Sequence, residues 1–102
     1  MSTIVIVRYR TRPDAADDNT RLIEAVFTSL SEVDTGDFRY TAYRLADGVS
    51  FVHIAGIAAD GNPLVTLPAF AEFQRELALR CAEQPAPSEA TVVGSCPGQR
   101  RS

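Results

Sequence analysis

The chain has 102 residues, a mass of 11.1 kDa and a formal net charge of −3, with 45% hydrophobic and 23% charged residues. This size and composition predict one globular domain with a single small core. All ten basic residues are Arg, and the chain has one His and two Cys. The absence of Lys excludes a Schiff-base lysine and a P-loop, and one His with two Cys cannot build a metal site, so we expect no cofactor and no metal. The net negative charge argues against a nucleic-acid partner.

The beginning of the chain and its cysteines bear on the compartment. No basic segment precedes the apolar residues 4–7, and no stretch approaches the roughly 18 apolar residues that a membrane span needs. Cys81 and Cys96 are too few for a disulfide framework, so we expect two free thiols. We therefore expect a cytoplasmic protein with no membrane partner.

The first third of the chain predicts a strand and then a helix. Residues 3–10 are rich in β-branched side chains, which favours a strand. Asp14 is the expected helix N-cap, with Asp17 and Asp18 in the first turn, where acidic side chains are favourable. Helix capping also explains these three acids better than a metal cluster does. One apolar stripe then follows at helical spacing: Leu22, Ile23, Val26, Phe27, Leu30 and Val33. Gly36 is expected to end the helix.

The middle of the chain predicts a β-hairpin. Residues 38–45 and 49–57 have strand character, and the Asp47-Gly48 pair between them is a strong turn signal. Residues 59–63 are expected to form a loop.

The last third predicts a helix and a final strand. The helix is expected to start near Thr66 or Leu67, to bury Phe70, Phe73, Leu77 and Cys81, and to end at the proline-rich residues 84–88. Residues 89–95 are then expected to form the fourth strand. The order βαββαβ predicts an α+β, ferredoxin-like domain over residues 1–96, with an antiparallel four-stranded sheet and both helices on one face. Residues 97–102 are expected to be a flexible C-terminal tail.

Both faces of the predicted sheet are apolar near its centre. Alternation places Ile4 and Ile6 on one face of the first strand, and the apolar residues that alternate with them on the other face. The third strand also has apolar side chains on both faces. Because two helices cover only one face, the other would expose a large apolar patch in a monomer. We expect a homodimer packed sheet against sheet, through the face that carries Val5, Val7, Phe51 and Ile57.

Two stretches resemble the dimeric α+β-barrel superfamily, and within it the antibiotic-biosynthesis-monooxygenase-like proteins. They are Ile4-Val5-Ile6-Val7-Arg8-Tyr9-Arg10-Thr11-Arg12-Pro13, and Phe51-Val52-His53-Ile54-Ala55 leading to Leu67-Pro68-Ala69-Phe70-Ala71-Glu72-Phe73. With the remaining strands the resemblance covers about residues 3–95, and it rests on element order and hydrophobic pattern. It implies a dimeric barrel whose site lies between helices and sheet or inside the barrel.

The sequence departs from two enzymatic branches of that superfamily. The haem-degrading branch uses an Asn on the first strand, a Trp on the third strand and a His on the second helix. In this sequence the position of that Asn corresponds to about Val7, the chain has no Trp, and the second helix has no His. Haem degradation is therefore rejected. Quinone-forming monooxygenases often use a Trp with Tyr, Asn or Arg, and only the Trp is missing here.

His53, the only imidazole, is the first candidate for chemistry. It is expected to lie beside Ala55 at the wall of a mostly apolar cavity, where burial would keep it neutral at pH 7 and able to accept a proton. Tyr9 is the second candidate catalytic residue, and Tyr40, Phe51 and Asn19 are candidates for substrate binding. The alternative is that His53 is a packed core residue with satisfied hydrogen bonds.

Two functions remain open on the sequence. One is a cofactor-independent monooxygenase-like enzyme that acts on a small planar molecule, with His53 as base and the tyrosines positioning the substrate. The other is a non-catalytic module for small-molecule binding or dimerisation. The arginines flanking the first two strands, among them Arg10, Arg12 and Arg44, are expected to pair with surface acids rather than to bind a substrate.

Overall fold

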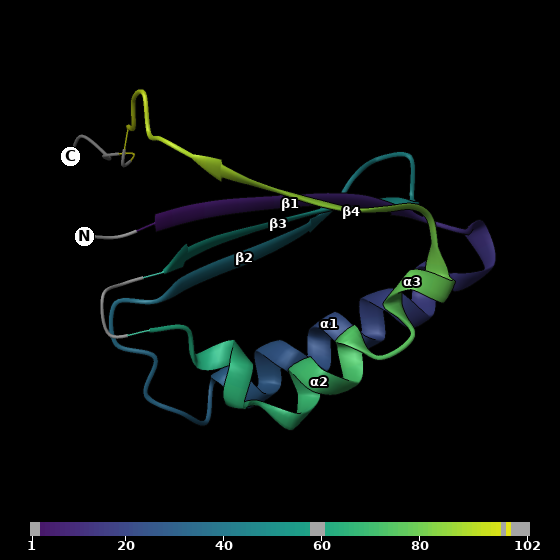
Figure 1. The fold of residues 1–102 in the computed structure, drawn as a ribbon, viewed down its shortest axis with the longest axis horizontal. Coiled ribbons are helices and arrows are strands. Elements are labelled where there is room, and N and C mark those ends of the chain that lie inside the picture. The colour runs from purple at the N-terminus through teal and green to yellow at the C-terminus, as the bar shows by residue number, and fades with distance from the viewer. Residues whose placement is uncertain (1–2, 58–60, 97, 99–102) are drawn as a thin grey trace.

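The computed structural model describes residues 3–57, 61–96 and 98 (Figure 1). One antiparallel sheet in the order β2-β3-β1-β4 contains the strands β1 (Thr3–Thr11), β2 (Arg39–Arg44), β3 (Ser50–Ile57) and β4 (Cys81–Ala90). The helices are α1 (Ala16–Leu30), α2 (Pro68–Gln74) and α3 (Leu77–Arg80), with 3₁₀ turns at η1 (Pro13–Ala15) and η2 (Pro63–Thr66). This is the predicted ferredoxin-like α+β fold.

The helices lie together on one face of the sheet, as Figure 1 shows. The core fills the space between the two layers. From α1 it receives Ile23, Val26 and Leu30, and from the sheet Tyr9 and Phe51. Burying such side chains supplies the main free energy of folding.

The hairpin between β2 and β3 forms as the Asp-Gly pair predicts. Asp47 accepts hydrogen bonds from the backbone N–H groups of Val49 (3.0 Å) and Ser50 (2.8 Å). Gly48 has a φ of 79°, in the left-handed region that favours glycine. The turn fixes the β2–β3 register, which brings Tyr40 next to the centre of the sheet.

The first helix differs from the prediction at both ends. Asp14 is not an N-cap: it lies within η1, its carboxylate pairs with Arg12 just before that turn (3.2 Å), and α1 begins only at Ala16. The helix ends at Leu30, so that Val33 lies beyond it and is 45% exposed. Pro13 occupies the first turn of η1, where its missing N–H is tolerated.

The last third differs more. The expected single helix is broken after α2, since Glu76 has a φ of 63°, and Cys81 is buried in β4 rather than in a helix. The fourth strand is Cys81–Ala90, not 89–95, and it contains Pro85 and Pro87. Prolines are tolerated there because β4 is an edge strand that pairs only with β1.

The sheet face expected to form the dimer is the wrong one. Val7 and Ile57 pack against the core under the helices, and Phe51 is 1% exposed within it. Alternation separates two faces but does not say which one the helices cover. The open face carries the other set, with Ile4, Ile6, Val52 and Ile54 half-buried near its centre.

The predicted C-terminal tail and the predicted loop before η2 are only partly covered by the structure. The tail over 97–102 lies outside the described residues apart from Gly98, as do residues 59 and 60 of the loop before η2. Residues 91–96 have no regular structure. In the part of the chain that the structure describes, no helix is long and apolar enough to cross a membrane.

Candidate functional site

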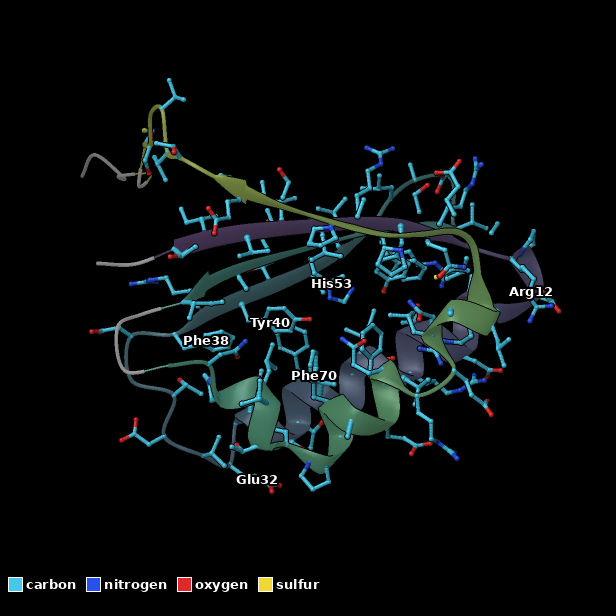
Figure 2. The ribbon with its side chains drawn as sticks, in the orientation of Figure 1. Arg12, Glu32, Phe38, Tyr40, His53 and Phe70 are labelled. Carbon is cyan, nitrogen blue, oxygen red and sulfur yellow. The ribbon has the colours of Figure 1, made fainter. Side chains whose placement is uncertain are left out.

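Three side chains from three strands meet under the centre of the sheet. His53 comes from β3, Tyr9 from β1 and Tyr40 from β2, and in Figure 2 the labelled His53 and Tyr40 extend into the space between sheet and helices. The Tyr9 hydroxyl lies 2.8 Å from His53 Nε2, and the Tyr40 hydroxyl lies 2.5 Å from His53 Nδ1. Both ring nitrogens of the only imidazole are therefore hydrogen-bonded to phenols.

The hydrogen-bond chain continues beyond Tyr9 into the helices. Asn19, in the first part of α1 and 0% exposed, donates from Nδ2 to the Tyr9 hydroxyl (2.9 Å). Arg80, the last residue of α3, donates from Nε to Asn19 Oδ1 (3.1 Å). Its other nitrogens donate to the carbonyl oxygens of Phe73 (2.7 Å) and Arg75 (3.2 Å). Five side chains thus form one connected network.

A cavity of about 160 Å³ lies beside His53. Its lining combines apolar side chains with a few polar ones: Val5, Val7, Tyr9, Tyr40, His53, Ala55, Ile57, Asn62, Leu64, Phe70, Phe73, Gln74 and Leu77. An apolar cavity of roughly 150 Å³ holds a benzene molecule. The space therefore suits one aromatic ring or a compact bicyclic molecule.

Aromatic stacking fixes the walls of this site. Phe51 stacks on Tyr9 at 5.4 Å between ring centroids, and Phe73 stacks on the His53 ring at 5.5 Å. Arg80 in turn lies over the Phe73 ring at 5.5 Å. Such contacts restrict ring rotation, so Tyr9 and His53 are held in fixed orientations.

Burial keeps Tyr9, His53 and Tyr40 neutral near pH 7. It lowers the pKa of His53 from 6.5 to about 4, because an apolar surrounding disfavours the imidazolium. Burial also raises the pKa of Tyr40 to about 12. The pKa of Tyr9 is raised as well, chiefly by burial, although the hydrogen bond from Asn19 opposes this. The groups can exchange hydrogen bonds with a ligand without carrying a formal charge.

The predicted site residues fall into two groups. His53, Tyr9 and Tyr40 line the cavity, and Ala55 lies beside them as the alternation predicted. Asn19 and Phe51 are not among the lining residues: Asn19 lies behind Tyr9 as its hydrogen-bond donor, and Phe51 packs against the Tyr9 ring.

Sequence reasoning missed Arg80 and Phe73 as parts of this site. Nothing in the local pattern marks Arg80, because its role depends on Asn19, 61 positions away in the chain. The surface arginines behave as expected: Arg44 pairs with Asp17 (3.1 Å), and Arg10 pairs with Glu83. Among the described residues, no three His, Cys, Asp or Glu side chains lie close enough to hold a metal ion.

Solved structures with the same architecture show what this fold is similar to. Rv0793 from Mycobacterium tuberculosis aligns with a TM-score of 0.67 at 20% identity, over 93% of this chain and 98% of its own. SnoaB from Streptomyces nogalater, a cofactor-independent oxygenase, aligns with a TM-score of 0.61 at 18% identity, over 95% and 98%. A protein described as an antibiotic biosynthesis monooxygenase aligns with a TM-score of 0.65 at 13% identity, over 92% and 100%. The chain has the fold of the antibiotic biosynthesis monooxygenase-like proteins.

This fold is the one that the sequence resemblance implied. The alignments with Rv0793 and SnoaB cover 93% and 95% of the chain, so the shared fold extends over nearly its whole length. No protein-family model matches the sequence, and no curated protein is significantly similar to it.

Proposed function

We propose that this protein binds a small planar organic molecule in the cavity beside His53 and acts on it as a cofactor-independent monooxygenase. The observation that carries the proposal is the Tyr9–His53–Tyr40 cluster at the wall of a ring-sized, mostly apolar cavity. Sites for small molecules combine such an apolar lining with a few fixed polar groups. The fold shared with SnoaB, itself a cofactor-independent oxygenase, supports the same assignment.

In the proposed reaction the substrate is a carbon acid with a CH₂ group next to a carbonyl. Its carbon gives a proton to the Tyr9 hydroxyl, which passes its own proton to His53 Nε2, while Tyr40 holds the carbonyl oxygen. The ion pair formed with the substrate anion offsets the unfavourable burial of the imidazolium. Molecular oxygen then reacts at the carbanion, so that CH₂ and O₂ become C=O and H₂O. The substrate itself supplies the four electrons.

The second candidate function is a non-catalytic binding module. It is favoured by the low pKa of His53, about 4, and by the complete hydrogen bonding of both ring nitrogens without a ligand. A weak, fully satisfied base is a poor proton acceptor unless the ligand provides a counter-charge.

2-Indanone, a planar bicyclic ketone with acidic CH₂ groups, separates these functions. Binding is measured by NMR titration, proton removal by exchange of the CH₂ protons in D₂O, and oxidation by oxygen uptake. We expect binding, exchange above the rate in buffer, and oxygen uptake, with the last two lost in His53→Gln. Tyr40→Phe should weaken binding about tenfold, the value of one hydrogen bond.

The matched control is Tyr43→Phe, because Tyr43 lies on the same strand, is exposed and should leave binding unchanged. Binding without exchange or oxygen uptake would favour the binding module. Failure of 2-indanone to bind at all would contradict both functions.

We further propose a homodimer that packs through the open sheet face. Ile6, Val52 and Ile54 form an apolar centre on that face, which the helices of the same chain leave uncovered (Figure 1). A second copy placed sheet against sheet would cover both patches at once.

Cys81 and Cys96 are both free thiols, which supports the expectation of a cytoplasmic protein.

A further inference from the structure

We infer that Arg80, acting through Asn19 and Tyr9, fixes the position of every proton in the network, so that the site is built for a ligand that accepts a hydrogen bond at Tyr40. The ligand class is a ketone or its enolate rather than a molecule that must donate a proton there. The ligand part rests on the proposed function. The proton arrangement does not.

The direction of the network starts at Arg80. A guanidinium has five N–H donors and no acceptor. Because Arg80 Nε lies 3.1 Å from the side chain of Asn19, the amide oxygen of Asn19 must face Arg80. The guanidinium cannot turn away freely, since its other nitrogens bind the carbonyl oxygens of Phe73 and Arg75.

Asn19 then orients the Tyr9 hydroxyl. With its oxygen committed to Arg80, Asn19 presents its NH₂ group, which donates to the Tyr9 oxygen at 2.9 Å. The remaining neighbour of this hydroxyl is His53 Nε2 at 2.8 Å. In either tautomer one of the two phenols accepts from His53 and keeps a proton without a protein acceptor. That proton is more costly at Tyr9, which is 2% exposed, than at Tyr40, which is only half-buried, because a deeply buried donor without a partner cannot bind water instead. Tyr9 therefore donates to Nε2.

His53 passes this direction on to Tyr40. A neutral imidazole with an acceptor at Nε2 carries its hydrogen at Nδ1, and Nδ1 lies 2.5 Å from the Tyr40 hydroxyl. The oxygen of Tyr40 thus accepts from His53, and its own proton is free to be donated. Within the described residues His53 is the hydrogen-bond partner of Tyr40, and Tyr40 lines the cavity. Its proton therefore serves a ligand oxygen.

This arrangement gives each end of the network one chemical task. Nε2 is the acceptor end, reached through Tyr9, and Tyr40 is the donor end. A ketone oxygen placed at Tyr40 receives a hydrogen bond that strengthens when negative charge develops on it as an enolate. Arg80 and Asn19 touch neither ligand nor reacting atoms, so they are positioning residues.

The single histidine makes the proton arrangement directly measurable. In ¹⁵N-labelled, ligand-free protein at pH 7, imidazole ¹⁵N shifts should show a protonated Nδ1 and an unprotonated Nε2. Asn19→Asp should invert the tautomer: the carboxylate accepts from both Arg80 and Tyr9, so the Tyr9 oxygen must accept from Nε2–H. Arg80→Lys should retain the wild-type tautomer, and Arg80→Met should lose the preference. A wild-type protein with hydrogen on Nε2 would overturn the inference, whether or not the variants fold.

A ligand pair tests the consequence for recognition. 2-Indanone and indane have similar shapes, but only the ketone accepts a hydrogen bond. In Asn19→Asp, Tyr40 should donate to His53 Nδ1, so the affinity for 2-indanone should fall about tenfold while that for indane stays the same. Unchanged affinity for 2-indanone in a variant with the inverted tautomer would overturn the ligand class. If neither compound binds the wild type, the proposed function fails, and the tautomer measurement still decides the proton arrangement.

Discussion

At the scale of single residues, the site is governed by one imidazole in an apolar surrounding. His53 is 5% exposed and is stacked by Phe73, so that water contributes little to its solvation. Two phenols replace that water at the ring nitrogens. Such an environment stabilises the neutral imidazole over the imidazolium. The neutral ring can exchange hydrogen bonds with its neighbours without becoming charged.

The lowered pKa of His53 predicts how stability depends on pH. The unfolded chain binds a proton at this residue near pH 6.5, whereas the folded protein does so only near pH 4. The contribution to stability is therefore complete above pH 6.5 and is lost as the pH falls toward 4, where it levels off. Its size is on the order of 3 kcal/mol. Urea denaturation at several pH values should show this loss in the wild type.

His53→Gln provides the control for that measurement, since no other imidazole is present. The free energy of unfolding of this variant should not show the decrease that the wild type shows between pH 6.5 and pH 4. The pKa of Asp47 is lowered to about 2 by its hydrogen bonds with Ser50 and Val49, so this carboxylate loses its contribution only in more acidic solution. Equal pH dependence in the two proteins would contradict the assignment of a desolvated His53.

At the scale of elements, turns decide which side chains meet. The β2–β3 turn sets the register that pairs Tyr40 with Ala55, two residues along β3 from its hydrogen-bond partner His53. Glu76, in a left-handed conformation, separates α2 from α3 and lets Arg80 reach back to carbonyl oxygens at the end of α2. Both breaks in regular structure therefore support the site.

Gly48→Ala tests the turn. A Cβ atom at Gly48 would meet nothing within 4 Å, so the expected cost is that of the backbone conformation alone, about 1 kcal/mol of unfolding free energy. Gly48→Asn should cost less, because Asn tolerates positive φ. Gly94→Ala is the matched control, since Gly94 also has open space around it and lies outside the helices and strands. Equal stability of the Gly48 and Gly94 variants would contradict the role of the turn.

At the scale of the whole molecule, the two faces of the sheet have different roles. One face and the helices enclose the core and the cavity, whereas the other is apolar at its centre and uncovered by this chain (Figure 1). Stable dimers usually bury a total of roughly 1,200–2,000 Å².

Ile54→Glu tests the dimer. The wild type should have the mass of two chains by light scattering after size exclusion. A charge at Ile54 should shift the protein to one chain, because an unpaired carboxylate is unfavourable in an apolar interface. Leu79→Glu, which adds the same charge at an exposed position on α3, should leave the mass unchanged. A wild-type mass of one chain at micromolar concentration would contradict the dimer.

The sequence by itself determined the fold class and the side chains that share a sheet face with His53. Alternation along residues 49–57 placed His53 on the same face as Phe51 and Ala55, and the Asp47-Gly48 turn then determined which strand brings Tyr40 alongside. These are local signals, since a strand has a period of two and a short turn fixes a register. The βαββαβ order followed from the same patterns.

Only the tertiary structure decided which face the helices cover, where the fourth strand lies and how the network is oriented. The prolines of β4 are compatible with a strand because that strand lies at the sheet edge, a position that the local sequence does not reveal. The same holds for Arg80, which contacts Asn19 across 61 positions. Several arrangements fit the local sequence patterns equally well, and long-range packing determines which of them forms. In this protein, long-range packing also determines the direction of the hydrogen bonds in the network.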